Sequence, residues 1–145
     1  ASRLCGQDPP AESNRNWDAA VAYCDGLSLG GHGPGSWHLP NVDELRSLIR
    51  GCAGTETGGS CGGTGECLAG RCCTTGCEGC AELGGPGPGC CSWPDGLGGG
   101  CNVFWSSSSY ADGDGYAWYV YFDYGSVYYM DKAPTYGIRC VRRLP

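Results

Sequence analysis

Apolar side chains recur at helical spacing in the first third of the chain, which predicts two helices. The first apolar stripe consists of Trp17, Ala20, Val21, Cys24 and Leu27. Asn16, directly before it, is a suitable N-cap because its side chain can accept a hydrogen bond from a free backbone N–H of the first turn. Asn41 is placed to begin the second helix, and Glu44 three residues later completes a capping-box pattern. The buried side of this second helix is expected to consist of Leu45, Leu48 and Ile49.

The last third of the chain alternates with the period of a β-strand. Over residues 117–122 the inward face consists of Trp118, Val120 and Phe122, and the outward face of Tyr119 and Tyr121. A turn over 123–126 joins this segment to a second strand in which Val127 and Tyr129 point inward. Further strands are predicted over residues 4–7 and 136–141. Helices first and antiparallel strands afterwards indicate a single α+β domain over residues 1–145.

Residues 52–101 differ in composition from the rest of the chain. Ten of the thirteen cysteines lie there, among many glycines and few large apolar side chains. Such a segment cannot bury enough surface to order itself by hydrophobic collapse. We therefore expect a disulfide-stapled insert, with pairings that the cysteine spacing leaves open. Because thirteen is odd, one cysteine is expected to be a free thiol or a bridge to another molecule.

Composition and charge narrow the class of protein. Thirteen cysteines in 145 residues are typical of an oxidising compartment, which predicts a secreted, extracellular protein. The chain begins without the charged and apolar regions of a signal peptide, so we expect a mature form. No apolar run is long enough to span a bilayer. The net charge of -6 argues against nucleic acid and anionic membranes as partners.

Tyrosine is concentrated in the last third of the chain, beyond what buried strands require. Tyr and Ser on a rigid frame give large amphipathic contact area at little entropic cost, which is typical of binding surfaces. The candidate ligand-binding residues are Tyr110, Tyr116, Tyr119, Tyr121, Asp123, Tyr124, Tyr128, Asp131, Lys132 and Tyr136. The alternative is that these tyrosines are ordinary exposed strand residues or pack under the insert. Aromatic faces contact both sugar rings and proteins, so a glycan and a cell-surface protein both remain open as ligands.

No catalytic pattern is supported. Cys73, Cys77 and Cys80 have the spacing of a radical iron–sulfur motif, but that chemistry needs a large barrel and a reducing compartment. Without a thioredoxin-like βαβ unit, the Cys77–Cys80 spacing is expected to serve structural bridges rather than redox chemistry or zinc. His32 and His38 have no recognisable nucleophile in context. We expect no enzymatic activity and no catalytic residue.

Five stretches resemble one bacterial family in sequence and in order: NWDAAVAYC, SWHLPNVDELRSLI, FWSSSSYA, YAWYVYFDYGSVYY and GIRCVR. This is the domain-of-unknown-function family named for the C-terminal domain of a collagen-like adhesin, related to the sulfatase-modifying-factor branch of the C-type lectin-like fold. The similarity covers residues 4–50 and 103–143, everything except the cysteine-rich insert. The resemblance implies a C-type lectin-like domain. It implies little about activity, because that fold hosts sugar binding, protein binding and one oxidase chemistry.

The resemblance also implies a disulfide between Cys24 and Cys140, which ties the ends of the domain together. Closing a loop of about 100 residues stabilises by about 4–5 kcal/mol in the chain-entropy model. His38 replaces the usual Arg of the family's Trp-Arg-Leu-Pro motif, which leaves open any ion pair that the Arg would make. Cys5 stands where relatives carry a hydrophobic residue, and we expect it to bridge to the insert.

The segment Asp112-Gly113-Asp114-Gly115 resembles the start of a calcium loop, but it lacks the later ligands and the closing Glu of an EF-hand. Sugar-binding C-type lectins hold calcium through Glu-Pro-Asn or Gln-Pro-Asp with Trp-Asn-Asp, and none of these tripeptides occurs here. Asp112 and Asp114 are therefore weak candidates for a structural calcium, and the alternative is a Gly-Asp turn. No other cofactor is expected.

Together these observations favour a secreted, non-catalytic binding or adhesion module that recognises a glycan or a cell-surface protein through its Tyr-rich face. The alternative is a structural subunit of an extracellular homo-oligomer or filament. In that case the tyrosines would pack against neighbouring copies, and the odd cysteine would bridge them.

Overall fold

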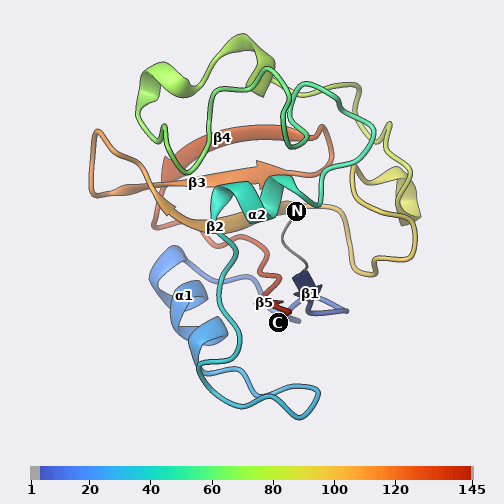
Figure 1. Ribbon diagram of the computed structural model, residues 1–145, viewed down its shortest axis with the longest axis vertical. Coiled ribbons are helices and arrows are strands. Elements are labelled where there is room, and N and C mark those ends of the chain that lie inside the picture. The colour runs from blue at the N-terminus through green and yellow to red at the C-terminus, as the bar shows by residue number, and fades with distance from the viewer. Residues whose placement is uncertain (1–3, 145) are drawn as a thin grey trace.

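The computed structural model describes residues 4–144, and Figure 1 shows their arrangement. Two helices precede the central sheet: α1 (Trp17–Asp25) and α2 (Val42–Arg46). The central sheet is antiparallel and consists of β2 (Val103–Ser109), β3 (Tyr116–Tyr121) and β4 (Ser126–Asp131). A second small sheet pairs β1 (Leu4–Gly6) with β5 (Val141–Arg143). The predicted α+β class is confirmed.

Both predicted helix N-termini are confirmed by their capping bonds. Asn16 Oδ1 accepts a hydrogen bond from the Ala19 N–H at 3.0 Å. Asn41 and Glu44 form a complete capping box, in which each side chain accepts from the other residue's backbone N–H, at 2.8 and 3.0 Å. The second helix is shorter than its apolar pattern indicates, because α2 ends at Arg46 and the buried Ile49 follows in the next turn.

The central sheet is apolar on both faces, and each face supports its own cluster. The register of the three strands places Val120 of β3 opposite Phe104 of β2 and Val127 of β4. These three residues pack against α2 and the cysteine-rich insert. Trp105 and Ala117 point to the opposite face and pack against α1 and residues 136–140. Figure 1 shows this layering, with the insert (green to yellow) on one side of the sheet and α1 on the other.

The insert is stapled as predicted, and it also contributes to the core. Its disulfides are Cys52–Cys80, Cys61–Cys77, Cys67–Cys72 and Cys91–Cys101. It contains three short 3-10 turns, η1 (Gly70–Cys72), η2 (Thr75–Cys77) and η3 (Pro88–Cys90). Trp93 is fully buried, and its ring centroid lies 5.6 Å from that of Phe104 and 5.2 Å from that of Phe122. The insert therefore forms one wall of the core, and hydrophobic burial assists the disulfides in ordering it.

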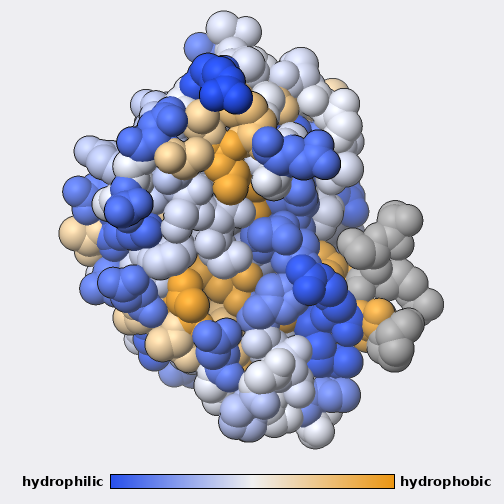
Figure 2. Space-filling view, turned by 60° about the vertical axis from the view of Figure 1, so that its left-hand side comes forward, coloured by the Kyte–Doolittle hydropathy of each residue, from blue (hydrophilic) through white to orange (hydrophobic). Residues whose placement is uncertain are grey.

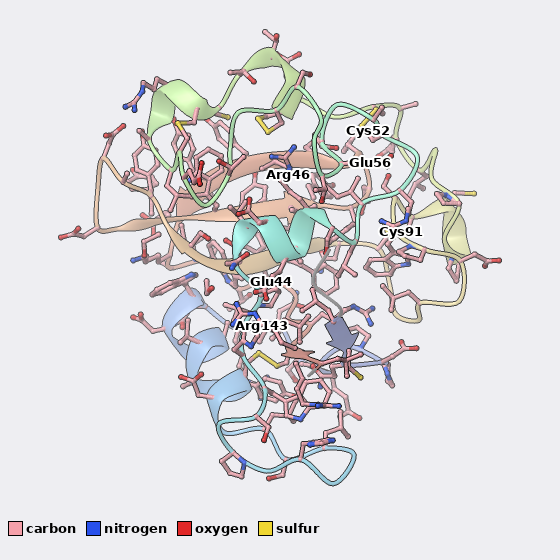
Figure 3. All side chains as sticks on the ribbon, in the orientation of Figure 1. Glu44, Arg46, Cys52, Glu56, Cys91 and Arg143 are labelled. Atoms are coloured by element: carbon pink, nitrogen blue, oxygen red, sulfur yellow. A yellow bond between two sulfur atoms is a disulfide. The ribbon has the colours of Figure 1, made fainter. Side chains whose placement is uncertain are left out.

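Two buried arginines of the host domain hold the insert by its backbone. Arg46 of α2 donates to the carbonyls of Thr55 (2.7 Å), Glu56 (3.0 Å), Cys61 (3.2 Å) and Gly63 (2.7 Å). Figure 3 shows this side chain between α2 and the insert. Arg139 donates to the carbonyls of Gln7 and Gly98, and its guanidinium lies 5.0 Å from the Trp93 ring centroid. Burial lowers the pKa of both arginines, yet the carbonyl acceptors replace the water that each guanidinium loses.

The long-range disulfide implied by the family resemblance is confirmed. Cys24 of α1 and Cys140 are bonded, with a Cα–Cα distance of 5.4 Å, and both side chains are fully buried. The expected bridge from Cys5 to the insert is wrong, because Cys5 is a free thiol. It packs in the cluster around α1, on the face of the sheet opposite to the one that the insert's cysteines cover.

Two further expectations need correction. The sequence analysis expects one cysteine without a partner in the chain, whereas three are free over residues 4–144: Cys5, Cys73 and Cys90. The predicted strand over 136–141 is also displaced: Tyr136 and Gly137 make only isolated bridges, and the strand β5 begins at Val141. Ile138 and Cys140 are buried as expected, but Arg139 between them is buried as well, and the segment lacks a continuous hydrogen-bonded neighbour.

His38, at the position where the family resemblance leads us to expect Arg, pairs with Glu44. Its Nε2 lies 2.9 Å from Glu44 Oε1, and the other carboxylate oxygen accepts from Arg143 Nε at 2.9 Å. Figure 3 shows Glu44 and Arg143 meeting between α2 and β5. Since Glu44 also caps α2, this carboxylate joins the helix to the C-terminal strand.

Candidate functional site

A pocket of about 400 Å³ lies between the β3–β4 hairpin and the insert. Three tyrosines form its sheet side, Tyr119 and Tyr121 of β3 and Tyr128 of β4. The insert side is formed by Cys73, Thr74, Thr75, Cys77 and Glu78, and Ser126 and Val127 complete the lining. The predicted Tyr-rich face therefore forms part of a concave site whose other wall the insert supplies.

Strand pairing explains why these tyrosines converge. Tyr119 is directly opposite Tyr128 in the β3–β4 register, and their ring centroids are 6.4 Å apart with an angle of 69° between the planes. Tyr128 is 43% exposed, whereas Tyr119 is half-buried. Tyr128 therefore lies at the solvent side of the pocket, and Tyr119 lies deeper. Such steep aromatic pairs are a favourable arrangement for rings in contact.

Backbone bonds fix the insert above the hairpin. Ser126 Oγ donates to the Glu78 carbonyl at 2.7 Å, and the Cys80 N–H donates to the Tyr124 carbonyl at 2.7 Å. Cys80 is in turn bonded to Cys52, so this edge of the pocket is tied both to the hairpin turn and to the start of the insert. The pocket walls are therefore held before any ligand arrives.

The phenols and the free thiol of the pocket keep their protons at neutral pH. Burial, followed by the neighbouring Tyr136 and Tyr128, raises the pKa of Tyr119 to about 12. Burial and the negative charge of Glu78 raise the pKa of the Cys73 thiol. Desolvation, together with the carboxylates of Asp123 and Glu82, raises the pKa of Tyr121. The Tyr121 end of the pocket thus experiences a negative field.

Other predicted residues lie beside the pocket rather than in it. Asp123 and Tyr124 occupy the β3–β4 turn, and the Tyr124 hydroxyl donates to Glu82 Oε2 at 3.1 Å. The Tyr124 ring centroid is 5.2 Å from that of Tyr121. Tyr136 packs under the sheet, with its ring centroid 4.8 Å from that of Trp105, so its main contact is structural.

The remaining predicted residues are at the opposite end of the sheet. Tyr110 stacks on Tyr129 at 4.1 Å and meets Tyr116 edge-on at 5.9 Å. Lys132 Nζ lies 4.0 Å from the ring centroid of Trp17. Asp131 Oδ1 accepts from the Ala133 N–H at 2.8 Å, which closes a local turn. The structure therefore divides the predicted set between separate places and does not form one continuous surface.

The two calcium candidates lie in the β2–β3 connection. Asp112 Oδ2 accepts from the Gly70 N–H at 2.8 Å, so this carboxylate ties the hairpin to η1 of the insert. Within residues 4–144, no group of three or more His, Cys, Asp or Glu side chains is arranged to hold a metal ion. A calcium at Asp112 and Asp114 stays a prediction, and any such ion would need backbone oxygens or water as further ligands.

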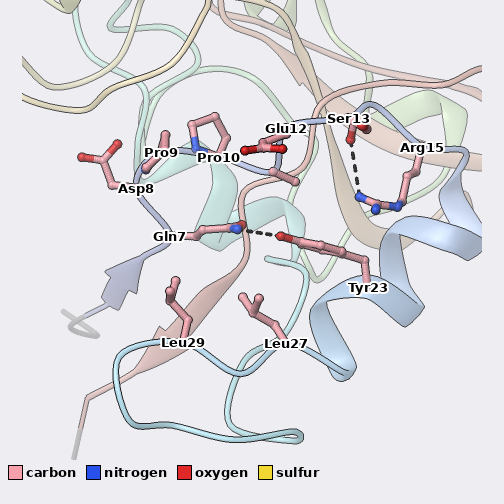
Figure 4. A pocket seen from close by; sticks show the side chains of 11 residues that line it. Gln7, Asp8, Pro9, Pro10, Glu12, Ser13, Arg15, Tyr23, Leu27 and Leu29 are labelled. Carbon is pink, nitrogen blue, oxygen red and sulfur yellow. Dashed lines mark hydrogen bonds between the residues drawn. The ribbon is translucent and has the colours of Figure 1, made fainter.

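A second pocket of about 390 Å³ lies beside β1 and α1 (Figure 4). Gln7 Nε2 donates to the Tyr23 hydroxyl at 2.8 Å, and the Arg15 guanidinium lies 4.4 Å from the Tyr23 ring centroid. Asp8 and Glu12 also line it. Gln7, Arg15 and Tyr23 thus contact one another rather than the open space of this pocket, which makes it the weaker candidate.

Figure 2 shows the hydropathy of one face of the molecule. On this face the apolar surface is divided into small patches by charged and polar side chains. Monomers rarely expose large apolar patches unless a partner covers them. A pocket is therefore a better guide to binding here than the apolar surface of this face.

The sequence analysis missed the insert's contribution to the site. Thr74, Thr75 and Glu78 lie in the stretch Cys73–Cys80, which was interpreted only as a source of disulfides. The sequence did contain a signal for this role: polar and acidic residues between closely spaced cysteines are held in place by disulfides and can therefore line a binding site. Only the tertiary contact with β4 shows which strand it faces.

The fold and the pocket define a disulfide-rich α+β domain with a concave aromatic site. Comparison with known proteins places it more narrowly: residues 3–142 match the Lcl C-terminal domain family, and the chain belongs to that family. The match runs through the cysteine-rich insert. No curated protein and no solved structure matches the chain. The structure also contains, over the residues it describes, no helix that is long and apolar enough to cross a membrane.

Proposed function

We propose that the chain is a secreted, non-catalytic binding module of the adhesin type with a C-type lectin-like fold, and that the pocket between the β3–β4 hairpin and the insert is its recognition site. Membership of the Lcl C-terminal domain family supports an extracellular adhesin-like module. Five disulfides suit the oxidising environment that such a module meets. The ligand is a glycan or a cell-surface protein.

One observation carries the proposal: three tyrosines from two paired strands face a polar wall across a pre-formed pocket. Ligand sites are typically concave, largely pre-formed, and lined by aromatic side chains with a few polar groups that fix orientation. The pocket volume of about 400 Å³ falls within the usual range for such sites.

A matched pair of variants tests the site. Tyr128 and Tyr116 are equally exposed, at 43%, but only Tyr128 lines the pocket. We expect Tyr128→Ala to weaken binding on glycan and cell-surface protein arrays, and Tyr116→Ala to leave it unchanged. Binding that Tyr116→Ala removes and Tyr128→Ala preserves would place the recognition site at the other end of the sheet. An array on which the unmodified protein binds nothing would contradict the proposed function itself.

A structural subunit of a homo-oligomer is the second candidate, favoured by the exposed free thiol of Cys90. A disulfide between Cys90 residues of two copies would give a covalent dimer without disturbing the five internal bridges. Size-exclusion chromatography with and without reductant, repeated on Cys90→Ser, tests this candidate. A monomer under all conditions argues against it.

A further inference from the structure

The pocket at the β3–β4 hairpin combines aromatic walls with negative charge and no positive charge. None of its lining residues is Lys, Arg or His, and the one ionised side chain among them is Glu78. Over the described part of the chain, Glu78 makes no ion pair: its carboxylate has no Lys, Arg or His partner within 4.0 Å. An unpaired carboxylate beside electron-rich rings attracts a cation.

Two more carboxylates reinforce this charge from the hairpin turn. Glu82 accepts from the Tyr124 hydroxyl, and the Tyr124 ring packs against that of Tyr121. Asp123 is next to Tyr124, and its Oδ1 is buried without a hydrogen-bond partner in the structure. Neither carboxylate has a basic partner within salt-bridge distance over residues 4–144. The negative field at the Tyr121 end of the pocket is therefore not neutralised from within the protein.

Two hydroxyl groups of the pocket donate their protons to backbone carbonyls, and the charged acceptor that stays free is the Glu78 carboxylate. Ser126 Oγ donates to the Glu78 carbonyl at 2.7 Å. Thr74 Oγ1 donates to the Ser60 carbonyl at 3.2 Å and accepts from the Gly62 N–H at 3.1 Å. A primary ammonium has three donors to satisfy, whereas a quaternary ammonium has none. A quaternary ammonium would use charge and aromatic contact alone, and comparison with a primary ammonium tests which of the two this pocket prefers.

The arrangement of the rings agrees with this requirement. Tyr119 and Tyr128 meet at 69°, so together they offer surfaces in two directions to a compact group. Recognition of quaternary ammonium ions by several aromatic faces is well established in other proteins. We infer that this pocket binds a quaternary ammonium group of the choline type, held over Tyr119, Tyr121 and Tyr128 and neutralised by Glu78. This inference rests on the proposed function, because it names the ligand chemistry of the same site.

Calorimetric titration of the whole chain with choline tests the charge requirement directly. The control ligand is 3,3-dimethylbutan-1-ol, which has the same shape as choline but carries no charge. We expect choline to bind at least about tenfold more tightly, since charge is the only difference between the two ligands. Equal binding of both ligands, or binding of neither, would overturn the inference. Tighter binding of butylamine than of choline would also overturn it, because a hydrogen-bonded primary ammonium would then be the preferred group.

Two variants with matched controls locate the binding. Tyr128→Ala removes an exposed ring, and Glu78→Gln removes the charge of an exposed side chain, so both variants are expected to fold. We expect each to weaken choline binding about fivefold or more. Tyr116→Ala and Glu66→Gln change exposed residues outside the pocket and should leave choline binding unchanged. Equal losses in the variants and their controls would contradict the assignment.

The inference and the proposed function fail in different ways. If an array ligand needs Tyr128 but is not displaced by choline, the pocket is a recognition site and the quaternary ammonium assignment is wrong. If choline displaces the array ligand from the unmodified protein, both stand. An array without any ligand, combined with choline binding that depends on Tyr128, supports the inference and contradicts the glycan or protein ligand.

Discussion

Tyr119 lies where the central sheet, residues 136–140 and the pocket meet. Its ring contacts Tyr128 on the pocket side and Tyr136 on the core side, at centroid distances of 6.4 and 5.7 Å. Ionising this phenol would place a negative charge in a half-buried site with no basic partner among the pocket-lining residues. The residue therefore supports the pocket as a neutral, protonated ring.

This placement predicts a late titration for Tyr119. Its pKa in the folded chain is raised from 10.0 to about 12, so folding favours the protonated form. The resulting stability is fully present below pH 10 and is lost as the pH rises towards 12. We expect Tyr119→Phe to remove the last phenolate to appear in a near-ultraviolet absorbance titration. The urea midpoint of the variant should also fall less than that of the unmodified chain between these pH values. Equal decreases in the urea midpoint of the variant and of the unmodified chain would contradict the assignment of the raised pKa to Tyr119.

Two of the three free thiols, Cys90 and Cys73, should react at different rates. Cys90 is exposed, whereas Cys73 is half-buried and its pKa is raised by burial and by Glu78. Since the thiolate is the reactive form, Cys73 should react slowly with a disulfide reagent such as Ellman's reagent under native conditions. We expect Cys90→Ser to remove the fast phase of the reaction. Cys73→Ser should leave the fast phase intact, and a fast phase that disappears in Cys73→Ser would show that this thiol is more open than the structure indicates.

At the scale of elements, the five-residue helix α2 connects the insert to the C-terminal strand β5. Through Arg46 it donates to four insert carbonyls, and through Glu44 it joins β5. The insert has few side chains that could bury its backbone, so a guanidinium fork from the host domain satisfies carbonyls that would otherwise lie buried without donors.

Removing this fork should destabilise the chain strongly. We expect Arg46→Ala to lower the free energy of unfolding by about 3–5 kcal/mol, because several buried carbonyls lose their donors at once. Arg46→Lys should recover only part of the loss, since an ammonium cannot reproduce the planar fork. Urea unfolding and limited proteolysis of residues 52–64 measure both effects. Arg50→Ala is the control, because the exposed Arg50 side chain donates to the nearby carbonyls of Ser47 and Ile49. A similar loss there would contradict the special role of Arg46.

Local signals in the sequence predicted local structure well. Asn16 and Asn41 cap their helices as expected, and the alternation over residues 117–122 separates the two faces of β3 correctly, although the face predicted as outward also packs against the cluster around α1. The errors concern residues whose role depends on distant neighbours. Cys5 is free because it packs in the cluster around α1, whereas the insert's cysteines pack on the other face of the sheet. Residues 136–140 form no continuous strand because only isolated bridges flank them. The same holds for the pocket, whose tyrosines were predicted but whose second wall was not.

At the scale of the whole molecule, the sheet is the partition between two differently built halves. The half with α1 relies on one long-range disulfide and a small apolar cluster, whereas the insert half relies on four short-range disulfides, Trp93 and backbone bonds to arginine. Because both halves share β2 and β3, ordering of one face supports the other. The pocket lies at the edge of the sheet, where the insert meets the β3–β4 hairpin.

The two halves should therefore respond differently to loss of a disulfide. Cys24 and Cys140 are 116 residues apart in sequence, and Cys91 and Cys101 are 10 apart. In the chain-entropy model these loops correspond to about 5 and about 3 kcal/mol of stabilisation through the unfolded state. We expect the double variant Cys24→Ala/Cys140→Ala to lose more stability in urea than Cys91→Ala/Cys101→Ala. Its m-value should also rise, because its unfolded chain exposes more surface. Equal losses with unchanged m-values would mean that native packing around each bridge, rather than loop closure, sets its contribution.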